Sequence, residues 1–246
     1  MEIALAVISG GFIGAVLGFV GAGGAMLSVP ILLYIFDFTA IPATTGALAI
    51  VLLAALAGAI PKAKAKEILY RDALVIWSLG LVTNLATSIL AHRLSDTFIT
   101  TGFAAILLLA AISMFRKSKA KEHRRMSIPA LVLVSLGIGA LTGIFGIGGG
   151  FIVVPVLIHA FGTPPRIATG TSLVVICLNS ITAFIGHYSH WDEVDWKYPI
   201  VIAISAVLVA LLASHKQSGL NSDTSRKLFA LLLISISTFT LFKTYL

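Results

Sequence analysis

Charged residues are scarce in this chain of 246 residues: Asp, Glu, Lys and Arg together make up only 11%. A soluble domain carries about 25%. Hydrophobic residues account for 58% of the chain, and its mean hydropathy is +1.04. Because a soluble core of this size leaves much of its surface exposed, so much apolar surface needs lipid as solvent. The composition predicts an all-α integral membrane protein, with residues 1–246 forming a single transmembrane domain.

Cysteine is also nearly absent, since Cys177 is the single cysteine of the chain. This excludes an intrachain disulfide and a metal site built from a cysteine cluster. Phosphate-loop, zinc-protease and serine-hydrolase motifs are missing, so we expect no cofactor and no enzymatic activity. The N-terminus lacks the basic region of a cleaved signal peptide.

Basic residues outnumber acidic ones, and the net charge is +7. In a membrane protein such an excess is typical of cytoplasmic loops, so we expect no nucleic-acid partner. All acidic residues lie outside the apolar segments or at their edges, and the same holds for Lys and Arg. The interior of the membrane domain is therefore predicted to carry no permanent charge.

Apolar segments long enough to approach or exceed the width of a bilayer recur along the whole chain. Two of them stand out, because they run 34 residues each without a charge and would be about 51 Å long as straight helices. Each contains clustered glycines, which break helices. We expect two half-helices of about 16 residues in each, the second starting near Ala25 or Phe151. The segments are 3–36, 43–60, 73–91, 97–115, 128–161, 168–187, 198–214 and 227–242.

The two long segments are copies of one another at an offset of 125 residues without a gap. The pairing matches Gly14, Gly18, Gly21, Gly23, Gly24, Val29, Pro30, Phe36, Ala43, Thr44 and Leu48 with Gly139, Gly143, Gly146, Gly148, Gly149, Val154, Pro155, Phe161, Ala168, Thr169 and Leu173. Such self-similarity indicates an internal duplication. The predicted fold is two homologous halves, 1–115 and 128–246, each a glycine-broken half-helix pair plus three transmembrane helices, joined by a basic linker, 116–127.

Two topologies fit this pattern. If the long segments re-enter as hairpins, the halves are inverted repeats and the basic residues divide 14 to 3 between the two sides. If the long segments cross, the halves are parallel repeats and the division is 12 to 5. We favour the inverted repeat for its stronger asymmetry. Both topologies place loop 61–72 and linker 116–127 in the cytoplasm.

The glycine breaks are the candidate binding site. A half-helix that starts at a break presents free amides and the positive end of its dipole, which attract anions. Broken helices of this kind form the binding sites of many transporters. Hydroxyl and amide groups nearby would add hydrogen bonds without charge. The candidate substrate-binding residues are Gly21, Gly23, Gly24, Ala25, Thr44, Thr45, Gly146, Gly148, Gly149, Gly150, Thr169, Thr171, Ser172, Asn179 and Ser180; no metal ligands are expected among them.

Two other functions stay open at this point. An anion channel would use the same dipoles without alternating access. A membrane enzyme or metal-binding protein would use His187 and His190, beside Asp192 and Glu193. We instead interpret this histidine segment as an interfacial aromatic belt with a solvated acidic loop.

The duplicated Gly-x-Gly-Gly, followed by an apolar stretch and Val-Pro, ends at Pro30 and at Pro155. Together with Ala-Thr-Thr at 43–45 and Ala-Thr-Gly-Thr-Ser at 168–172, it resembles the TauE/SafE family of sulfite exporters. The resemblance implies a secondary transporter in the inner (plasma) membrane of a bacterial cell. Its substrate would be a small anion such as sulfite, sulfoacetate or another sulfonate or organic anion. Its partners would be that anion and the lipid bilayer, and a homodimer is compatible with this.

Overall fold

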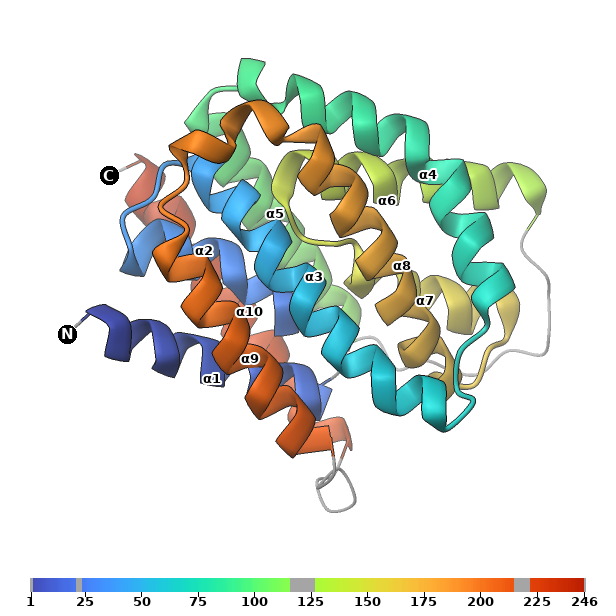
Figure 1. The fold of residues 1–246 in the computed structure, drawn as a ribbon. Helices are drawn as coiled ribbons and strands as arrows, with labels where there is room; N and C mark the ends of the chain where they lie inside the picture. Colours follow the sequence, from blue (N-terminus) through green and yellow to red (C-terminus); the bar gives the residue numbers. More distant parts are fainter. Residues whose placement is uncertain (1, 21–23, 116–126, 215–221, 246) are drawn as a thin grey trace.

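The computed structural model describes residues 2–20, 24–115, 127–214 and 222–245, and every regular element within these ranges is helical (Figure 1). The expected all-helical fold is confirmed. The elements are α1 (Glu2–Val20), η1 (Gly24–Leu27), α2 (Ser28–Ile35), α3 (Ala40–Lys64), α4 (Tyr70–Leu90), η2 (Ala91–Arg93), α5 (Asp96–Phe115), α6 (Ile128–Phe145), α7 (Gly150–Phe161), α8 (Pro165–Gly186), η3 (Tyr188–Glu193), α9 (Lys197–Ser214) and α10 (Ser222–Tyr245).

Proline and glycine set several of the helix ends, as their backbone preferences require. Pro164 is extended and Pro165 opens α8, a position where the missing amide hydrogen costs nothing. Gly146 and Gly162 end α6 and α7 in the left-handed conformation, which closes the last helical turn. Glycine at position 146 therefore divides the second long segment into the two helices α6 and α7.

Each long segment folds back on itself, as the hairpin topology requires. At the two ends of the first, Tyr198 donates a hydrogen bond to Glu2 over 2.6 Å, and its ring lies 4.7 Å from that of Phe36. In the second, Phe161 at the end of α7 joins the same apolar cluster as Leu131 near the start of α6. Both segments therefore begin and end on one side of the molecule.

The lengths of the half-helices differ from the expected 16 residues. The outgoing helices α1 and α6 have 19 and 18 residues, and the returning helices α2 and α7 have 8 and 12. The expected start of the first returning helix near Ala25 is wrong, because a 3-10 turn, η1, precedes α2 and delays it to Ser28. A 3-10 turn is a common lead into an α-helix. Each hairpin is therefore a nearly full-length helix with a short return.

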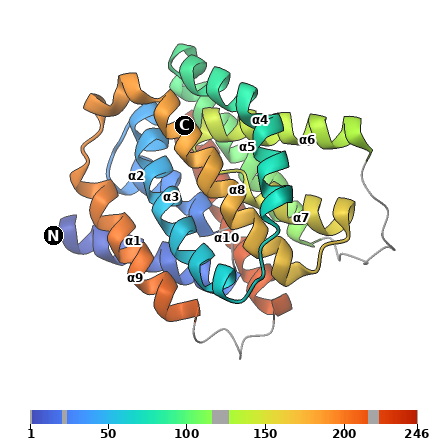
Figure 2. The ribbon, with the colours of Figure 1, turned by 45° about the vertical axis from the view of Figure 1, so that its right-hand side comes forward.

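The long helices pack in pairs, each formed by one helix of the first predicted half and one of the second (Figures 1 and 2). α1 runs parallel to α9, and α6 runs parallel to α4, with hydrogen bonds along both pairs. α3 and α8 run antiparallel, because the start of α3 meets the end of α8 and the residues after α3 meet the start of α8. α5 and α10 also run antiparallel. Antiparallel contact between corresponding helices supports inverted over parallel repeats; the duplication itself stays a prediction.

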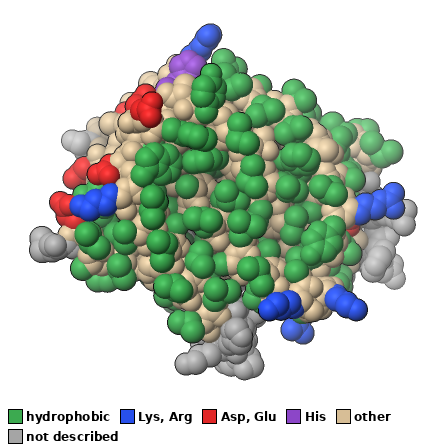
Figure 3. All heavy atoms as spheres, in the orientation of Figure 1, with side chains coloured by type: hydrophobic (Ala, Val, Ile, Leu, Met, Phe, Trp, Pro, Cys, Tyr) green, Lys and Arg blue, Asp and Glu red, His purple; other side chains and the backbone are tan. Residues whose placement is uncertain are grey.

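The surface has the distribution expected of a protein in a bilayer. Six helices of the described residues are long and apolar enough to cross a membrane: Ala40–Lys64, Tyr70–Arg93, Asp96–Ser113, Ile128–Phe145, Pro165–Gly186 and Lys227–Tyr245. Figure 3 shows one face covered by hydrophobic side chains, with charged side chains mainly at its edges. Among the described residues, the buried polar side chains include no Asp, Glu, Lys or Arg. The chain is an integral membrane protein.

Helices α4 and α6 touch through their backbones where glycines face each other. A Cβ at Gly139 would collide with the carbonyl oxygen of Gly80 and lie 2.6 Å from the hydroxyl of Thr83. Two residues away on α6, a Cβ at Gly137 would meet nothing within 4 Å. Close contact of this kind lets carbonyl groups accept hydrogen bonds across the interface, and Thr83 donates one to Leu136 over 2.7 Å.

Gly139→Ala should therefore destabilise the protein, because α6 must move away from α4. Overpacking costs about 1–3 kcal/mol, so we expect a lower thermal unfolding midpoint in detergent, measured by the loss of the monodisperse peak in size-exclusion chromatography. Gly137→Ala is the matched control and should leave the midpoint unchanged or raise it. Equal midpoints for the two variants would contradict the close contact.

Candidate functional site

The break between α6 and α7 is a turn that only glycine adopts readily. Gly146, Gly148 and Gly149 have φ values of 65°, 70° and 70°, a left-handed region that costs other residues roughly 1–2 kcal/mol each. The turn reverses the chain within the protein. Its last residue precedes α7, whose first amides lack carbonyl partners within the helix.

Three helices enclose this turn at close range. A Cβ at Gly146 would lie 2.7 Å from the carbonyl oxygen of Thr44 in α3. A Cβ at Gly148 would lie 2.9 Å from Val51 of α3 and 2.8 Å from Ile176 of α8. On the α6 side, Gly149 faces Ile138 and Thr142. The break is therefore buried by protein, as irregular backbone within a membrane must be.

Ser180 of α8 points a free hydroxyl at the break. Its side chain is fully buried, its Oγ has no hydrogen-bond partner, and this oxygen would lie 3.3 Å from a Cβ at Gly148. A buried polar group without a partner is costly and commonly marks a place where a ligand or water binds. Ser28, the first residue of α2, also has a buried Oγ without a partner. Both returning helices thus start beside an unused hydroxyl.

Asn179, the neighbour of Ser180, is held by a second buried amide. Asn84 of α4 donates its Nδ2 hydrogens to the backbone oxygen of Asn179 over 3.0 Å and to its Oδ1 over 3.1 Å. Ser88 in turn donates to the backbone oxygen of Asn84 over 2.7 Å. This pairing fixes α8 against α4 and sets the position of Ser180.

His187 caps α8 and joins the other two helices around the break. Its Nδ1 lies 2.8 Å from the hydroxyl of Thr45, and its Nε2 lies 3.0 Å from the carbonyl oxygen of Gly143. Only 1% of the side chain is exposed. The expected solvated loop is therefore wrong for His187, because partners on α3 and α6 draw it inside. No group of three or more metal-ligating side chains occurs among the described residues.

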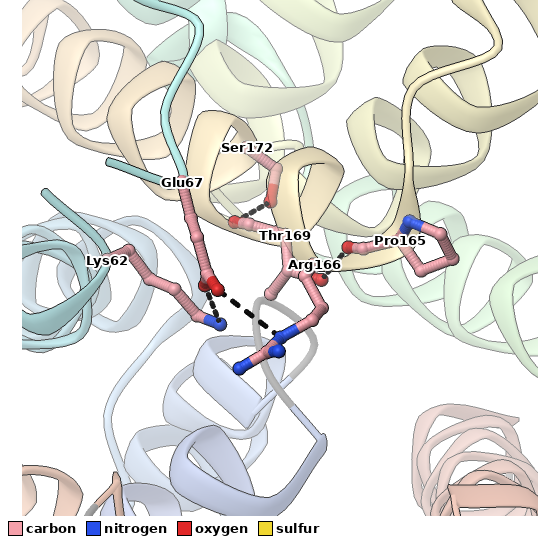
Figure 4. A network of polar contacts seen from close by, with 6 residues as sticks. All are labelled: Lys62, Glu67, Pro165, Arg166, Thr169 and Ser172. Atoms are coloured by element: carbon pink, nitrogen blue, oxygen red, sulfur yellow. Dashed lines mark hydrogen bonds and ion pairs between the residues drawn. The ribbon is translucent and has the colours of Figure 1, made fainter. Parts of the chain in front are cut away.

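The hydroxyls expected at the start of α8 lie there, at the end of the helix away from His187 (Figure 4). Thr169 donates to Pro165 over 2.9 Å, and Ser172 donates to Thr169 over 2.8 Å. Thr171 accepts the amide of Leu69 over 2.9 Å. These groups bond within α8 or to the loop after α3, which crosses over them.

An ion-pair cluster holds that loop in place. Lys62 donates to Glu67 over 2.8 Å, and Nε of Arg166 lies 3.2 Å from the other carboxylate oxygen (Figure 4). This cluster binds α3 to the start of α8 on the side of the molecule away from His187.

The structure thus brings together part of the expected site. The second break consists of Gly146, Gly148, Gly149 and Gly150, with Thr44 and Ser180 directly beside it. Thr45 and Asn179 are the next residues along α3 and α8, and they bond to His187 and Asn84. Thr169, Thr171 and Ser172 lie among the first eight residues of α8, where their hydroxyls bond to α8 itself or to Leu69. Gly21 and Gly23 are outside the described residues, and Gly24 and Ala25 belong to η1.

Sequence reasoning missed Thr142 as a site residue. A Cβ at Gly149 would lie 3.1 Å from its hydroxyl, and its carbonyl accepts the amide of Gly146 over 3.0 Å. The available signal was its position one turn before Gly146, where an α6 side chain must lie beside the break. Asn84 and His187 were visible as polar residues, but their partners come from distant helices.

Comparison with known proteins covers almost the whole chain. The family model described as "Sulfite exporter TauE/SafE" matches residues 6–240. A "Probable membrane transporter protein" of Xylella fastidiosa is 26% identical over 96% of this chain and 94% of its own. Relatives with the same description are 24% identical in Bacillus subtilis (YunE, 96% of each chain) and 29% identical in Methanocaldococcus jannaschii (92% of this chain, 89% of its own). No solved structure matches.

The Lys62–Glu67–Arg166 cluster predicts a pH-dependent stability. The hydrogen bond from Lys62 is the main reason that the pKa of Glu67 lies below its ordinary value of 4.5, and partial burial opposes it. A lowered carboxyl pKa stabilises the fold above about pH 4.5, and that stability is lost as the pH falls further. We expect the thermal unfolding midpoint to fall between pH 5 and pH 3.5, measured in detergent.

Glu67→Gln should remove much of this acid sensitivity, because the amide does not titrate. Asp192→Asn is the control, since Asp192 is exposed and forms no ion pair among the described residues. If Glu67→Gln kept the wild-type pH profile, the cluster would not contribute to stability.

Proposed function

The chain belongs to the sulfite exporter TauE/SafE family and is a membrane transporter, and we propose that it exports a small anion bound at the glycine breaks. The substrate class is sulfite, sulfoacetate or a related sulfonate or organic anion. The single observation that carries this proposal is the fully buried, unpartnered hydroxyl of Ser180 facing the turn at the start of α7.

The chemistry around the second break suits an anion without a fixed positive charge. The start of α7 supplies free amides and the positive end of a helix dipole. Ser180 supplies a hydroxyl donor, and Thr142 and Thr44 lie beside the same turn. A cation carrier would be expected to have Asp or Glu within its spans, and the buried polar side chains described here include neither.

We propose that the side carrying the Lys62–Glu67–Arg166 cluster faces the cytoplasm, because most Lys and Arg residues lie there under the hairpin topology. An inside-negative potential then favours efflux of a monoanion by about 2.3 kcal/mol per 100 mV. A carrier also explains the two half-sites better than a channel does, because inverted halves can expose one site alternately.

The flux experiment uses proteoliposomes containing the purified protein, loaded with sulfite, sulfoacetate or methanesulfonate, and an imposed inside-negative potential. We expect efflux that saturates with concentration and is accelerated by anion on the opposite side. Efflux without such acceleration would identify a channel. No efflux of any of these anions would contradict the proposed function.

Gly148→Ala should abolish most of this flux. The new methyl group would lie against Val51, Ile176 and Ser180 in a backbone conformation that alanine disfavours. A loss of about 1.4 kcal/mol is tenfold, so we expect at least a tenfold lower initial rate. Gly137→Ala, in the open position on α6, is the control and should transport normally. Normal transport by Gly148→Ala would place the substrate elsewhere.

Ser180→Ala separates a role in binding from a role in the fold. The hydroxyl has no partner in the protein, so its removal should leave the thermal unfolding midpoint unchanged or raise it. If the hydroxyl donates to the anion, the Kd should rise about five- to tenfold, the effect of a hydrogen bond of about 1–1.5 kcal/mol. Ser172→Ala, which removes a bond to Thr169, is the comparison variant. An unchanged Kd in Ser180→Ala would contradict the assigned contact.

A further inference from the structure

Among the side chains that the structure describes, one histidine is buried, and it lies next to a site that otherwise lacks charge. His187 follows the span Pro165–Gly186 directly and is 1% exposed. Among the described residues, the other buried polar side chains are Ser, Thr and Asn. An imidazole is the side chain whose charge most readily changes near neutral pH. It is therefore the group that can bring a positive charge to this region and remove it again.

The hydrogen bonds of His187 determine where its protons lie. The carbonyl oxygen of Gly143 only accepts, so Nε2 carries a hydrogen and donates it over 3.0 Å. The hydroxyl of Thr45 lies 2.8 Å from Nδ1 and also 2.8 Å from the carbonyl oxygen of Ile41. A hydroxyl has one hydrogen, and it cannot serve both acceptors.

A second proton on the ring resolves this conflict. With Nδ1 protonated, His187 donates to Thr45, and Thr45 donates to Ile41, so that every close contact is a hydrogen bond. With Nδ1 unprotonated, Thr45 donates to Nδ1 and the bond to Ile41 is lost. The observed arrangement therefore accepts a proton with no movement of heavy atoms.

The partners of His187 are also the neighbours of the break. Gly143 lies in the last turn of α6, three residues before Gly146. Thr45 follows Thr44, whose backbone lies against Gly146. A proton on His187 and an anion at the start of α7 would therefore attract each other through protein of low dielectric constant, where such attraction is strong.

Within the described part of the chain, the other titratable groups near His187 lie on η3, which carries Tyr188, His190, Asp192 and Glu193, and on η2, which carries His92 and Arg93. His190 in η3 lies 2.8 Å from Glu193 through Nδ1, and its ring lies 5.5 Å from that of His92 in η2. α6 carries no titratable residue, and Lys62 and Lys64 of α3 lie at its opposite end. Burial lowers the pKa of His187 from its ordinary 6.5, the bond to Gly143 opposes this shift, and a charge on His190 adds to it.

We propose that His187 is a proton-binding site linked to the anion site at the second break, so that anion binding takes up a proton. This inference rests on the proposed function of the break. At neutral pH the empty site holds a neutral imidazole, because burial disfavours its charged form. A bound anion favours the charged form. Anion affinity therefore increases as the pH falls.

The test measures the Kd of methanesulfonate for the purified protein between pH 8 and pH 5.5, because this sulfonate keeps its charge throughout. For wild type we expect the Kd to fall by up to tenfold per pH unit in part of this range, the limit for uptake of one proton. His187→Gln, which keeps hydrogen-bonding groups but does not titrate, should show a flat profile. His190→Gln is the matched histidine control and should keep the wild-type slope.

A second measurement needs no variant. Calorimetric titration of wild type with methanesulfonate at pH 7, in two buffers of different ionisation enthalpy, should show proton uptake on binding. Binding without proton uptake, or a folded His187→Gln protein with the wild-type slope, would overturn the proton site and leave the transport proposal intact. Absence of methanesulfonate, sulfite and sulfoacetate binding at every pH would overturn both.

Discussion

The peptide backbone cannot leave its hydrogen bonds unsatisfied in hydrocarbon, and this constraint determines how the rest of the structure is arranged. The chain breaks its sixth helix at Gly146 and starts α7 at Gly150. Unpaired backbone groups at that depth persist only where protein encloses them. α3, α6 and α8 supply the enclosure through Thr44, Ile138 and Ile176. The antiparallel pairing of α3 and α8 then brings the second break to the middle of the bundle.

The enclosure is polar without carrying formal charge. Asn84 fixes Asn179 and therefore the helix that presents Ser180. His187 links the ends of α6 and α8 to the start of α3. Each of these groups is buried and most have partners, so they hold the helices in register. Ser180 is the exception beside the second break, because its buried hydroxyl has no partner in the protein. A rigid polar frame around an unused donor is the arrangement that the proposed anion site would need, because preorganisation lowers the cost of binding.

The sequence predicted the features that depend on local chemistry. The glycine cluster at 146–150 located the second break and the start of α7, although the consecutive Gly10 and Gly11 lie inside α1. Apolar length predicted five of the six helices long enough to span; the sixth is Ile128–Phe145, and Lys197–Leu212 is shorter than expected. The unequal hairpin arms and η1 could not be predicted, because Ser28 begins α2 through contacts that the sequence pattern does not contain. The burial of His187 also depends on distant partners, since Thr45 lies 142 residues away. Thr169 was expected beside a glycine break, but within the described residues it bonds inside α8.

The two predicted repeats differ at the residues on which the proposed anion and proton sites rest. At the offset of 125 residues, Asn179 and Ser180 correspond to Ala54 and Ala55, and His187 corresponds to Lys62. In the proposed carrier, inverted halves of identical chemistry would give two orientations of equal energy. Halves that differ at these positions would give orientations of unequal energy. The half-saturation concentrations for the anion should then differ between the two faces of the membrane. Detailed balance still requires the ratio of maximal rate to half-saturation to be equal in both directions when no gradient exists. In the proposed carrier, unequal halves would therefore tune the working range on each side, and the gradient and the potential alone would set the direction of net flow.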